Sequence, residues 1–207
     1  IAQGDHRSSV LEHLNRHNHL VLLGDPGSGK TTFVNFVALC LAGSSLNQRP
    51  NLADLTTPLH PAEEQSHSSR HAENRNPQLW EHGNLLPVRI VLRDFAARGL
   101  PPLGKKASAR HLILFIDSEL KNIGLGVYAS LLHRRLSDKG VLLMLDGMDE
   151  VPEAESRREQ IKVVVEDFAS TYPNCRILVT SRTYAYQMQN WRINGFREVI
   201  LAPFSRG

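Results

Sequence analysis

Short, mostly apolar runs alternate with amphipathic stretches along the chain. Five of the runs have the composition of strands: 19–23, 86–93, 141–146, 175–180 and 197–201. Stretches whose apolar residues recur at helical spacing predict helices at about 5–18, 31–42, 108–120, 127–137 and 156–172. The run at 141–146 is continuously apolar and ends in an acid, which is typical of a central parallel strand buried on both faces.

The stretch from 44 to 84 breaks this pattern. Proline, serine, asparagine, histidine and charged residues dominate it, so we predict a polar insertion that adds no strand to the core. His67 and His71 have the helical i,i+4 spacing of zinc ligands, but a merely polar, histidine-rich loop is the favoured interpretation. His13, His17 and His19 could also suggest a metal site, but no carboxylate or cysteine partner is in reach, so they are interpreted as solvated or edge histidines.

Composition describes an ordinary globular chain. At 207 residues, with 41% hydrophobic and 22% charged residues, it has the material for one large domain with a sizeable core. The net charge of +3 comes from basic residues interspersed with acids, so the sequence gives no sign of nucleic-acid binding. No apolar run approaches the ~18 residues of a membrane span, and no signal peptide opens the chain. We therefore expect a cytoplasmic protein with no membrane partner.

The cysteines and the chain ends add two expectations. Cys40 and Cys175 lie in apolar surroundings and are too few and too far apart for a disulfide framework, so both are interpreted as reduced core residues. The chain has no initiator methionine and stops just after an apolar run. Residues 1–207 are therefore expected to be a piece of a longer protein.

The segment between the first predicted strand and its following helix fits the phosphate-loop pattern G-x-x-x-x-G-K-[ST]. Gly27 and Gly29 lack a Cβ, so the backbone there can turn its N–H groups inward around a phosphate. Lys30 reaches the β- and γ-phosphates, the Thr31 hydroxyl is placed to ligate magnesium, and the helix start adds free N–H donors. The predicted binding loop comprises Gly24, Asp25, Pro26, Gly27, Ser28, Gly29, Lys30, Thr31 and Thr32.

Acidic residues follow the predicted strand at 141–146. Acids at the carboxyl end of a parallel strand point into the crevice where open sheets bind ligands. Asp146 is therefore the candidate Walker B acid, which would hold magnesium through water opposite Thr31. Asp149 and Glu150 lie one short turn further on, close enough to orient or deprotonate an attacking water. In the alternative interpretation these acids only end the strand and cap the next helix, which explains the whole set less well.

Thr180-Ser181-Arg182 ends the predicted strand at 175–180 in polar residues. If this strand lies beside the acidic one, the polar trio lies at the mouth of the same crevice. Arg182 is then placed to contact the γ-phosphate and distinguish a triphosphate from a diphosphate. The alternative is an exposed loop arginine with no such role.

Three of these segments together resemble the NACHT nucleotide-binding domain of STAND signalling ATPases, of a bacterial type: 22–32, 142–151 and 177–182. The acidic segment, with a glycine after its first acid, is the most specific of the three. The resemblance implies an α/β, AAA-like P-loop NTPase fold, a three-layer sandwich around a central, mostly parallel five-stranded sheet. It also implies ATP or ADP with Mg²⁺, slow hydrolysis, and a switch that forms homo-oligomers in defence or stress signalling.

The resemblance also carries over to particular residues and to further domains. Effector and sensor domains in the same longer chain, with helical and winged-helix segments after residue 207, are expected from it. The residues it implicates are Gly24, Gly29, Lys30 and Thr31 for phosphate and magnesium, Asp146 for magnesium, Asp149 and Glu150 for catalysis, and Arg182 for sensing the γ-phosphate.

Two rival functions stay open at the level of sequence. A phosphate-loop kinase would pass the γ-phosphate to a small acceptor, but the acidic pair at 149–150 favours water and no arginine-rich lid segment is visible. A non-hydrolysing module that uses nucleotide only for assembly would carry the same motifs. A GTPase is disfavoured, because no N-K-x-D guanine-reading motif follows the strand at 141–146.

Overall fold

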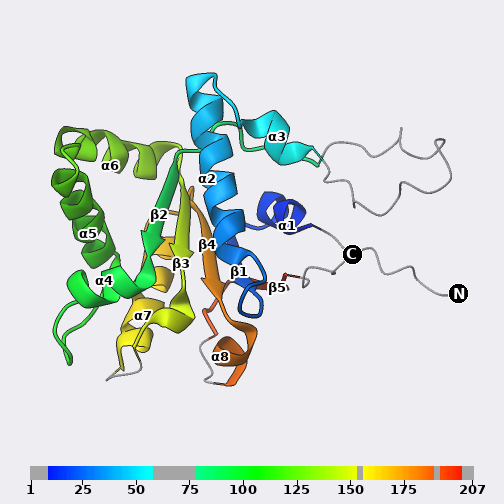
Figure 1. The fold of residues 1–207 in the computed structure, drawn as a ribbon. Helices are drawn as coiled ribbons and strands as arrows, with labels where there is room; N and C mark the ends of the chain where they lie inside the picture. The colour runs from blue at the N-terminus through cyan, green and yellow to red at the C-terminus, as the bar shows by residue number, and fades with distance from the viewer. Residues whose placement is uncertain (1–8, 58–77, 153–155, 189–191, 202–207) are drawn as a thin grey trace, which may run out of the picture.

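The computed structural model describes residues 9–57, 78–152, 156–188 and 192–201. Five parallel strands form one sheet in the order β2-β3-β4-β1-β5, which confirms the expected fold class. The strands are β1 (His19–Leu23), β2 (Pro87–Val91), β3 (Leu142–Asp146), β4 (Arg176–Ser181) and β5 (Arg197–Ile200). Figure 1 shows the strands with their carboxyl ends toward the bottom of the picture.

Helices fill the connections between the strands. The α-helices are α1 (Val10–Arg16), α2 (Lys30–Leu46), α3 (Leu52–Thr56), α4 (Leu92–Arg98), α5 (Ala109–Asn122), α6 (Ala129–Asp138), α7 (Arg157–Thr171) and α8 (Thr183–Met188). Short 3-10 helices are η2 (Gly126–Tyr128) and η3 (Met148–Glu150). Every helix expected from the apolar spacing is present in the described ranges, with shifts of a few residues at its ends; residues 5–8 of the first expected helix lie outside those ranges. The additional helices are α3, α4 and α8.

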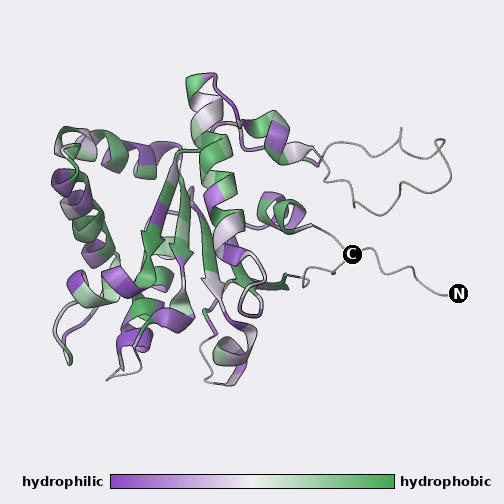
Figure 2. Cartoon of the chain, viewed as in Figure 1, coloured by the Kyte–Doolittle hydropathy of each residue, from purple (hydrophilic) through white to green (hydrophobic). Residues whose placement is uncertain are grey.

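The sheet is the middle one of three layers. Alternate residues of a strand point to opposite faces: on β3, Leu142 and Met144 pack with α1 and α2, whereas Leu143 and Leu145 pack with α4, α5, α6 and α7. Figure 1 shows α2 crossing one face of the sheet, and Figure 2 shows the strands as largely hydrophobic. Burial from both sides explains why the central strands appear in the sequence as continuous apolar runs.

The described part of the 44–84 stretch differs from the polar loop expected there. Helix α2 continues to Leu46, and α3 begins with a capping box in which the Asn51 N–H donates to Asp54 Oδ2 at 2.9 Å. Leu55 and Leu85 are buried in the same cluster as α1 and α2. A one-turn helix anchored by a single leucine has no apolar period, so the sequence pattern did not reveal it. His67 and His71 lie outside the described residues.

Two helices start directly at strand ends. The strand expected at 86–93 ends at Val91, because α4 begins at Leu92 and buries its first apolar side chain in the core. Helix α8 begins just after Arg182, and the hydroxyl of its buried Tyr186 accepts a hydrogen bond from the Ile193 N–H at 3.1 Å. The end of β4 is thereby fixed to the segment that leads into β5.

The cysteines have the core positions predicted for them. Cys40 and Cys175 are both free and buried, and burial raises the pKa of each thiol above its usual range. They belong to the clusters on opposite faces of the sheet. Within the described ranges, no helix combines the length and the apolar character that crossing a bilayer requires.

Candidate nucleotide-binding site

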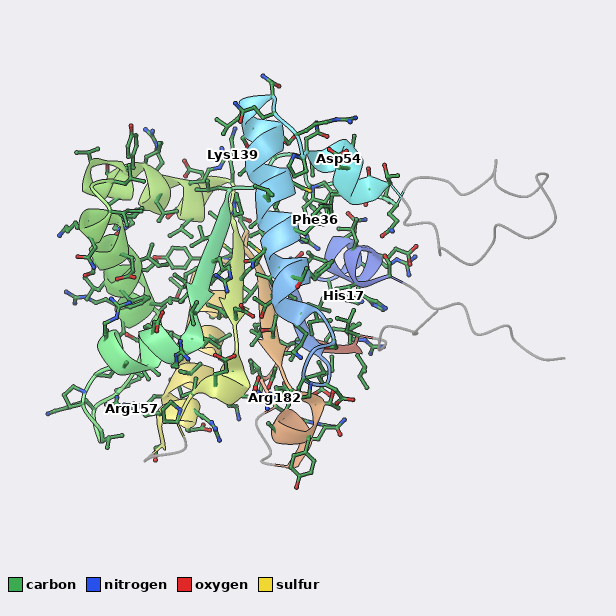
Figure 3. The ribbon with its side chains drawn as sticks, viewed as in Figure 1. His17, Phe36, Asp54, Lys139, Arg157 and Arg182 are labelled. Atoms are coloured by element: carbon green, nitrogen blue, oxygen red, sulfur yellow. The ribbon has the colours of Figure 1, made fainter. Side chains whose placement is uncertain are left out.

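The carboxyl ends of β1, β3 and β4 meet around an open pocket of about 300 Å³. In Figure 3, Arg182 lies at this edge of the sheet, beside the loop that precedes α2. Because parallel strands present their carboxyl ends at one edge, residues separated by 150 positions along the chain converge there. The lining residues are Pro26, Gly27, Gly29, Lys30, Thr31, Thr32, Asp146, Gly147, Asp149, Glu150, Thr180 and Arg182.

The phosphate loop has the backbone that its glycines predict. Gly27 and Gly29 have φ angles of 76° and 89°, in the left-handed region that favours glycine. Gly24 lies where a Cβ would approach Ser28 Oγ to 2.6 Å, and its N–H donates to the Ser181 carbonyl of β4 at 3.3 Å. Helix α2 starts at Lys30 with no side-chain cap, so the N–H groups of its first turn stay available to an anion.

Lys30 fills the centre of the loop. Its Nζ donates to the carbonyl oxygens of Gly24 at 2.6 Å and Asp25 at 3.0 Å, and to Ser28 Oγ at 3.3 Å. Burial lowers the pKa of Lys30, and the nearby Asp149 carboxylate opposes that shift. The lysine is therefore held in place by Gly24, Asp25 and Ser28. The remaining residues of the loop line the pocket.

Asp146 is fixed by contacts from three neighbouring elements. Its Oδ1 accepts hydrogen bonds from Thr180 Oγ1 at 2.7 Å and from Thr31 Oγ1 at 3.3 Å. Its Oδ2 pairs with Arg89 Nη2 of β2 at 2.6 Å, and only 7% of the Asp146 side chain is exposed. Asp146 is therefore held with one oxygen toward the phosphate loop, as the sequence predicts.

Sequence reasoning missed Arg89 and gave Thr180 no separate role. The available signal for Arg89 was a charged residue inside the apolar run at 86–93. Without the strand order, however, nothing in the sequence placed β2 beside β3, where Arg89 is opposite Met144 and reaches the following acid. Thr180 Oγ1 also accepts the Gly147 N–H at 2.9 Å, so it fixes the start of the acidic turn as well as its first carboxylate.

The two acids that follow Asp146, which are Asp149 and Glu150, have different surroundings. Both Asp149 oxygens are engaged by Arg182: Oδ2 pairs with the guanidinium Nε at 2.8 Å, and Oδ1 accepts the Arg182 backbone N–H at 3.0 Å. The Asp149 side chain is 8% exposed, whereas 53% of the Arg182 side chain is exposed at the pocket. Glu150 lines the same pocket and is exposed, and its side chain has no hydrogen-bond or ion-pair partner among the described residues.

The donor set of this pocket fits a magnesium ion. Thr31 Oγ1 and Asp146 Oδ1 are 3.3 Å apart, close to the separation of about 3 Å between adjacent oxygens around an octahedral Mg²⁺. Magnesium normally completes its shell with water and substrate phosphates, so one hydroxyl and one carboxylate suffice from the protein. The described residues contain no group of three or more His, Cys, Asp or Glu side chains arranged to hold a metal.

A phosphate loop after β1, an acid on β3 opposite the loop threonine and an arginine ending β4 define a P-loop nucleotide-binding NTPase. The family model for the NACHT domain matches residues 18–206, and the chain belongs to the NACHT family. A comparison with curated proteins gave no match. The family membership establishes a nucleotide-binding NTPase domain, in agreement with the fold and the pocket.

Proposed function

We propose that this chain is the nucleotide switch of a signalling ATPase. It binds ATP or ADP with Mg²⁺, hydrolyses ATP slowly, and couples its nucleotide state to self-association of a longer protein in defence or stress signalling. The observation that carries the proposal is the Asp149–Arg182 pair, which holds an exposed guanidinium beside the phosphate loop. The bacterial type and the effector and sensor domains stay predictions from the resemblance, and the cytoplasmic location stays a prediction from the sequence pattern.

We assign the phosphate and magnesium roles to the loop and β3. The first-turn N–H groups of α2 and the Lys30 ammonium bind the phosphates. Thr31 and Asp146 would hold Mg²⁺, with Arg89 and Thr180 orienting the Asp146 carboxylate. The bound ion supplies positive charge to the phosphate oxygens during phosphoryl transfer.

We assign different roles to the two acids of η3. Glu150 has no competing partner among the described residues, so it is the side chain free to take a proton from water. Asp149 has both oxygens engaged by Arg182, so it positions that arginine. This assignment narrows the sequence prediction, which grouped both acids as catalytic.

The switch step follows from the position of Arg182. Its guanidinium can contact either Asp149 or a γ-phosphate in the pocket, and the next residue begins α8. If the Arg182 guanidinium moved from Asp149 to a γ-phosphate, the position of α8 would be biased. Binding of the γ-phosphate would in this way change the conformation of the chain. ADP lacks the γ-phosphate, so it would leave Arg182 with Asp149.

Nucleotide titrations with the chain test this function. We expect ATP and ADP to bind in the presence of Mg²⁺, GTP to bind at least about tenfold more weakly, and ATP to be hydrolysed slowly to ADP and free phosphate. Calorimetry measures the affinities, phosphate release measures the turnover, and sedimentation velocity compares self-association with ATP and with ADP. Equal GTP affinity contradicts the adenine preference. Binding without turnover indicates an assembly module, and phosphate transfer to an acceptor indicates a kinase.

Replacing Arg89 tests the orientation of Asp146. We expect Arg89→Gln to slow single-turnover ATP hydrolysis by about tenfold to a hundredfold, because a buried carboxylate loses the partner of one oxygen. ATP affinity should stay within about threefold, since Arg89 does not line the pocket. Arg89→Lys should recover part of the rate. The control is Arg93→Gln, which removes an exposed arginine four positions further on; equal rates in both glutamine variants would contradict the role of Arg89.

A further inference from the structure

A second polar pocket, of about 370 Å³, lies at the opposite edge of the sheet from the phosphate loop. The amino ends of two neighbouring parallel strands form it: His19 begins β1 and Arg197 begins β5, while Arg16 ends α1 above them. Residues close to both ends of the described chain therefore meet in one place. The lining residues are Arg16, His17, Asn18, His19, Gly195 and Arg197.

The lining carries positive charge that no carboxylate in the described part of the chain neutralises by an ion pair. Arg16 and Arg197 are both exposed, and neither forms an ion pair or a side-chain hydrogen bond with any residue in the described ranges. The acids closest to these arginines in the sequence, Glu12 and Glu198, do not pair with them. Glu12, one turn earlier on α1, makes no ion pair with Arg16, and Glu198 pairs with Arg192 at 3.5 Å.

A third arginine lies behind the pocket. Arg176 is buried, and its guanidinium donates to the carbonyl oxygens of Leu14 and Asn15 and to Asn18 Oδ1, at 2.7–3.1 Å. These partners are neutral, so the full charge of Arg176 persists under the pocket. The contacts also hold the end of α1 in place, because the last carbonyls of a helix attract a cation. Arg16 and Asn18 are thereby presented on a fixed backbone.

Two histidines lie within the influence of these arginines. The pKa of His19 is lowered by burial and by the charge of Arg176, and its ring stacks on Phe196 at 5.0 Å. The pKa of His13 is lowered by burial and then by His17, Arg197 and Arg16. A cluster of unneutralised cationic groups raises the local concentration of anions.

We propose that this pocket binds the phosphate groups of a small phosphorylated molecule. A guanidinium can donate two parallel hydrogen bonds to a phosphate. Two arginines from different elements therefore suit a phosphate, which offers several acceptor oxygens, better than they suit a single carboxylate. The pocket, lined by six of the described residues, has room for a ligand larger than one phosphate. A bound anion would link α1 to the edge strand β5, which pairs with β1 alone.

Pyrophosphate is the probe that tests this site. The titration uses the Lys30→Ala chain, so that binding at the phosphate loop does not mask it, and wild-type protein saturated with Mg²⁺ and ADP serves as a second background. We expect pyrophosphate to shift the imidazole NMR signals of His17 and His19 and to bind more weakly as salt is raised. Arg16→Gln and Arg197→Gln should each weaken binding about tenfold, since each removes a charge-assisted contact.

The controls separate this site from general charge attraction and from the nucleotide switch. Arg134→Gln removes another exposed arginine that has no partner among the described residues, and it should leave pyrophosphate affinity unchanged. Circular dichroism verifies that each variant is folded. The proposal is overturned if pyrophosphate does not bind in either background, if the two pocket variants bind it as tightly as their parent, or if acetate binds equally well. None of these outcomes depends on ATP hydrolysis.

Discussion

Lys30→Ala is expected to weaken the binding of ATP with Mg²⁺ by about a hundredfold or more. Lys30 Nζ lies at the centre of the phosphate loop, bound to the Gly24 carbonyl at 2.6 Å and the Asp25 carbonyl at 3.0 Å. From there it reaches the β- and γ-phosphates, and each charge-assisted hydrogen bond contributes about 1.5–3 kcal/mol. Loss of two such contacts corresponds to the stated change in affinity. Isothermal titration calorimetry measures it directly.

The matched control for this variant is Lys139→Ala. Lys139 is an exposed lysine at the end of α6, labelled in Figure 3, and it does not line the nucleotide pocket. Its removal should leave ATP affinity unchanged. Thermal unfolding of both variants should resemble that of the parent, because neither change opens a cavity in the apolar core. Wild-type affinity in folded Lys30→Ala protein would mean that nucleotide binds elsewhere.

Glu150→Gln is expected to slow ATP hydrolysis by about a hundredfold to ten-thousandfold while ATP affinity stays within about threefold. General-base catalysis contributes an effect of this size, and glutamine keeps the shape of the side chain without its basicity. Glu150 makes no contact with other described side chains that the change would break. Single-turnover phosphate release and calorimetry on the same protein separate the rate from the affinity.

Asp149→Asn serves as the comparison for Glu150→Gln, because the two acids are neighbours with different partners. Asparagine cannot form the ion pair with Arg182 Nε at 2.8 Å, so Arg182 should lose its fixed position. We expect the preference for ATP over ADP to fall in Asp149→Asn and to persist in Glu150→Gln. Unchanged hydrolysis in Glu150→Gln, with a large loss in Asp149→Asn, would exchange the roles assigned to these acids.

Much of the fold follows from local sequence patterns. Strands buried on both faces must be apolar throughout, so the runs at 141–146 and 175–180 identified β3 and β4 within one or two residues. The one-turn helix α3 escaped prediction because it depends on a capping box and one buried leucine. Helix α4 was not predicted because its apolar residues continue the pattern of the preceding strand without a break.

The sequence by itself determined the nucleotide loop, because a phosphate loop is a local structure whose glycines, lysine and threonine lie close together in the sequence. The acidic segment at 142–151, together with 22–32 and 177–182, indicated the family. Only the tertiary structure decided which side chains share a partner. It paired Arg89 with Asp146 and Asp149 with Arg182, and it gave the Glu150 side chain no partner among the described residues. It also brought Arg16 beside Arg197. These pairings depend on strand order and register, which join residues far apart in sequence. The spacing of residues along the chain does not indicate the order of the strands in the sheet.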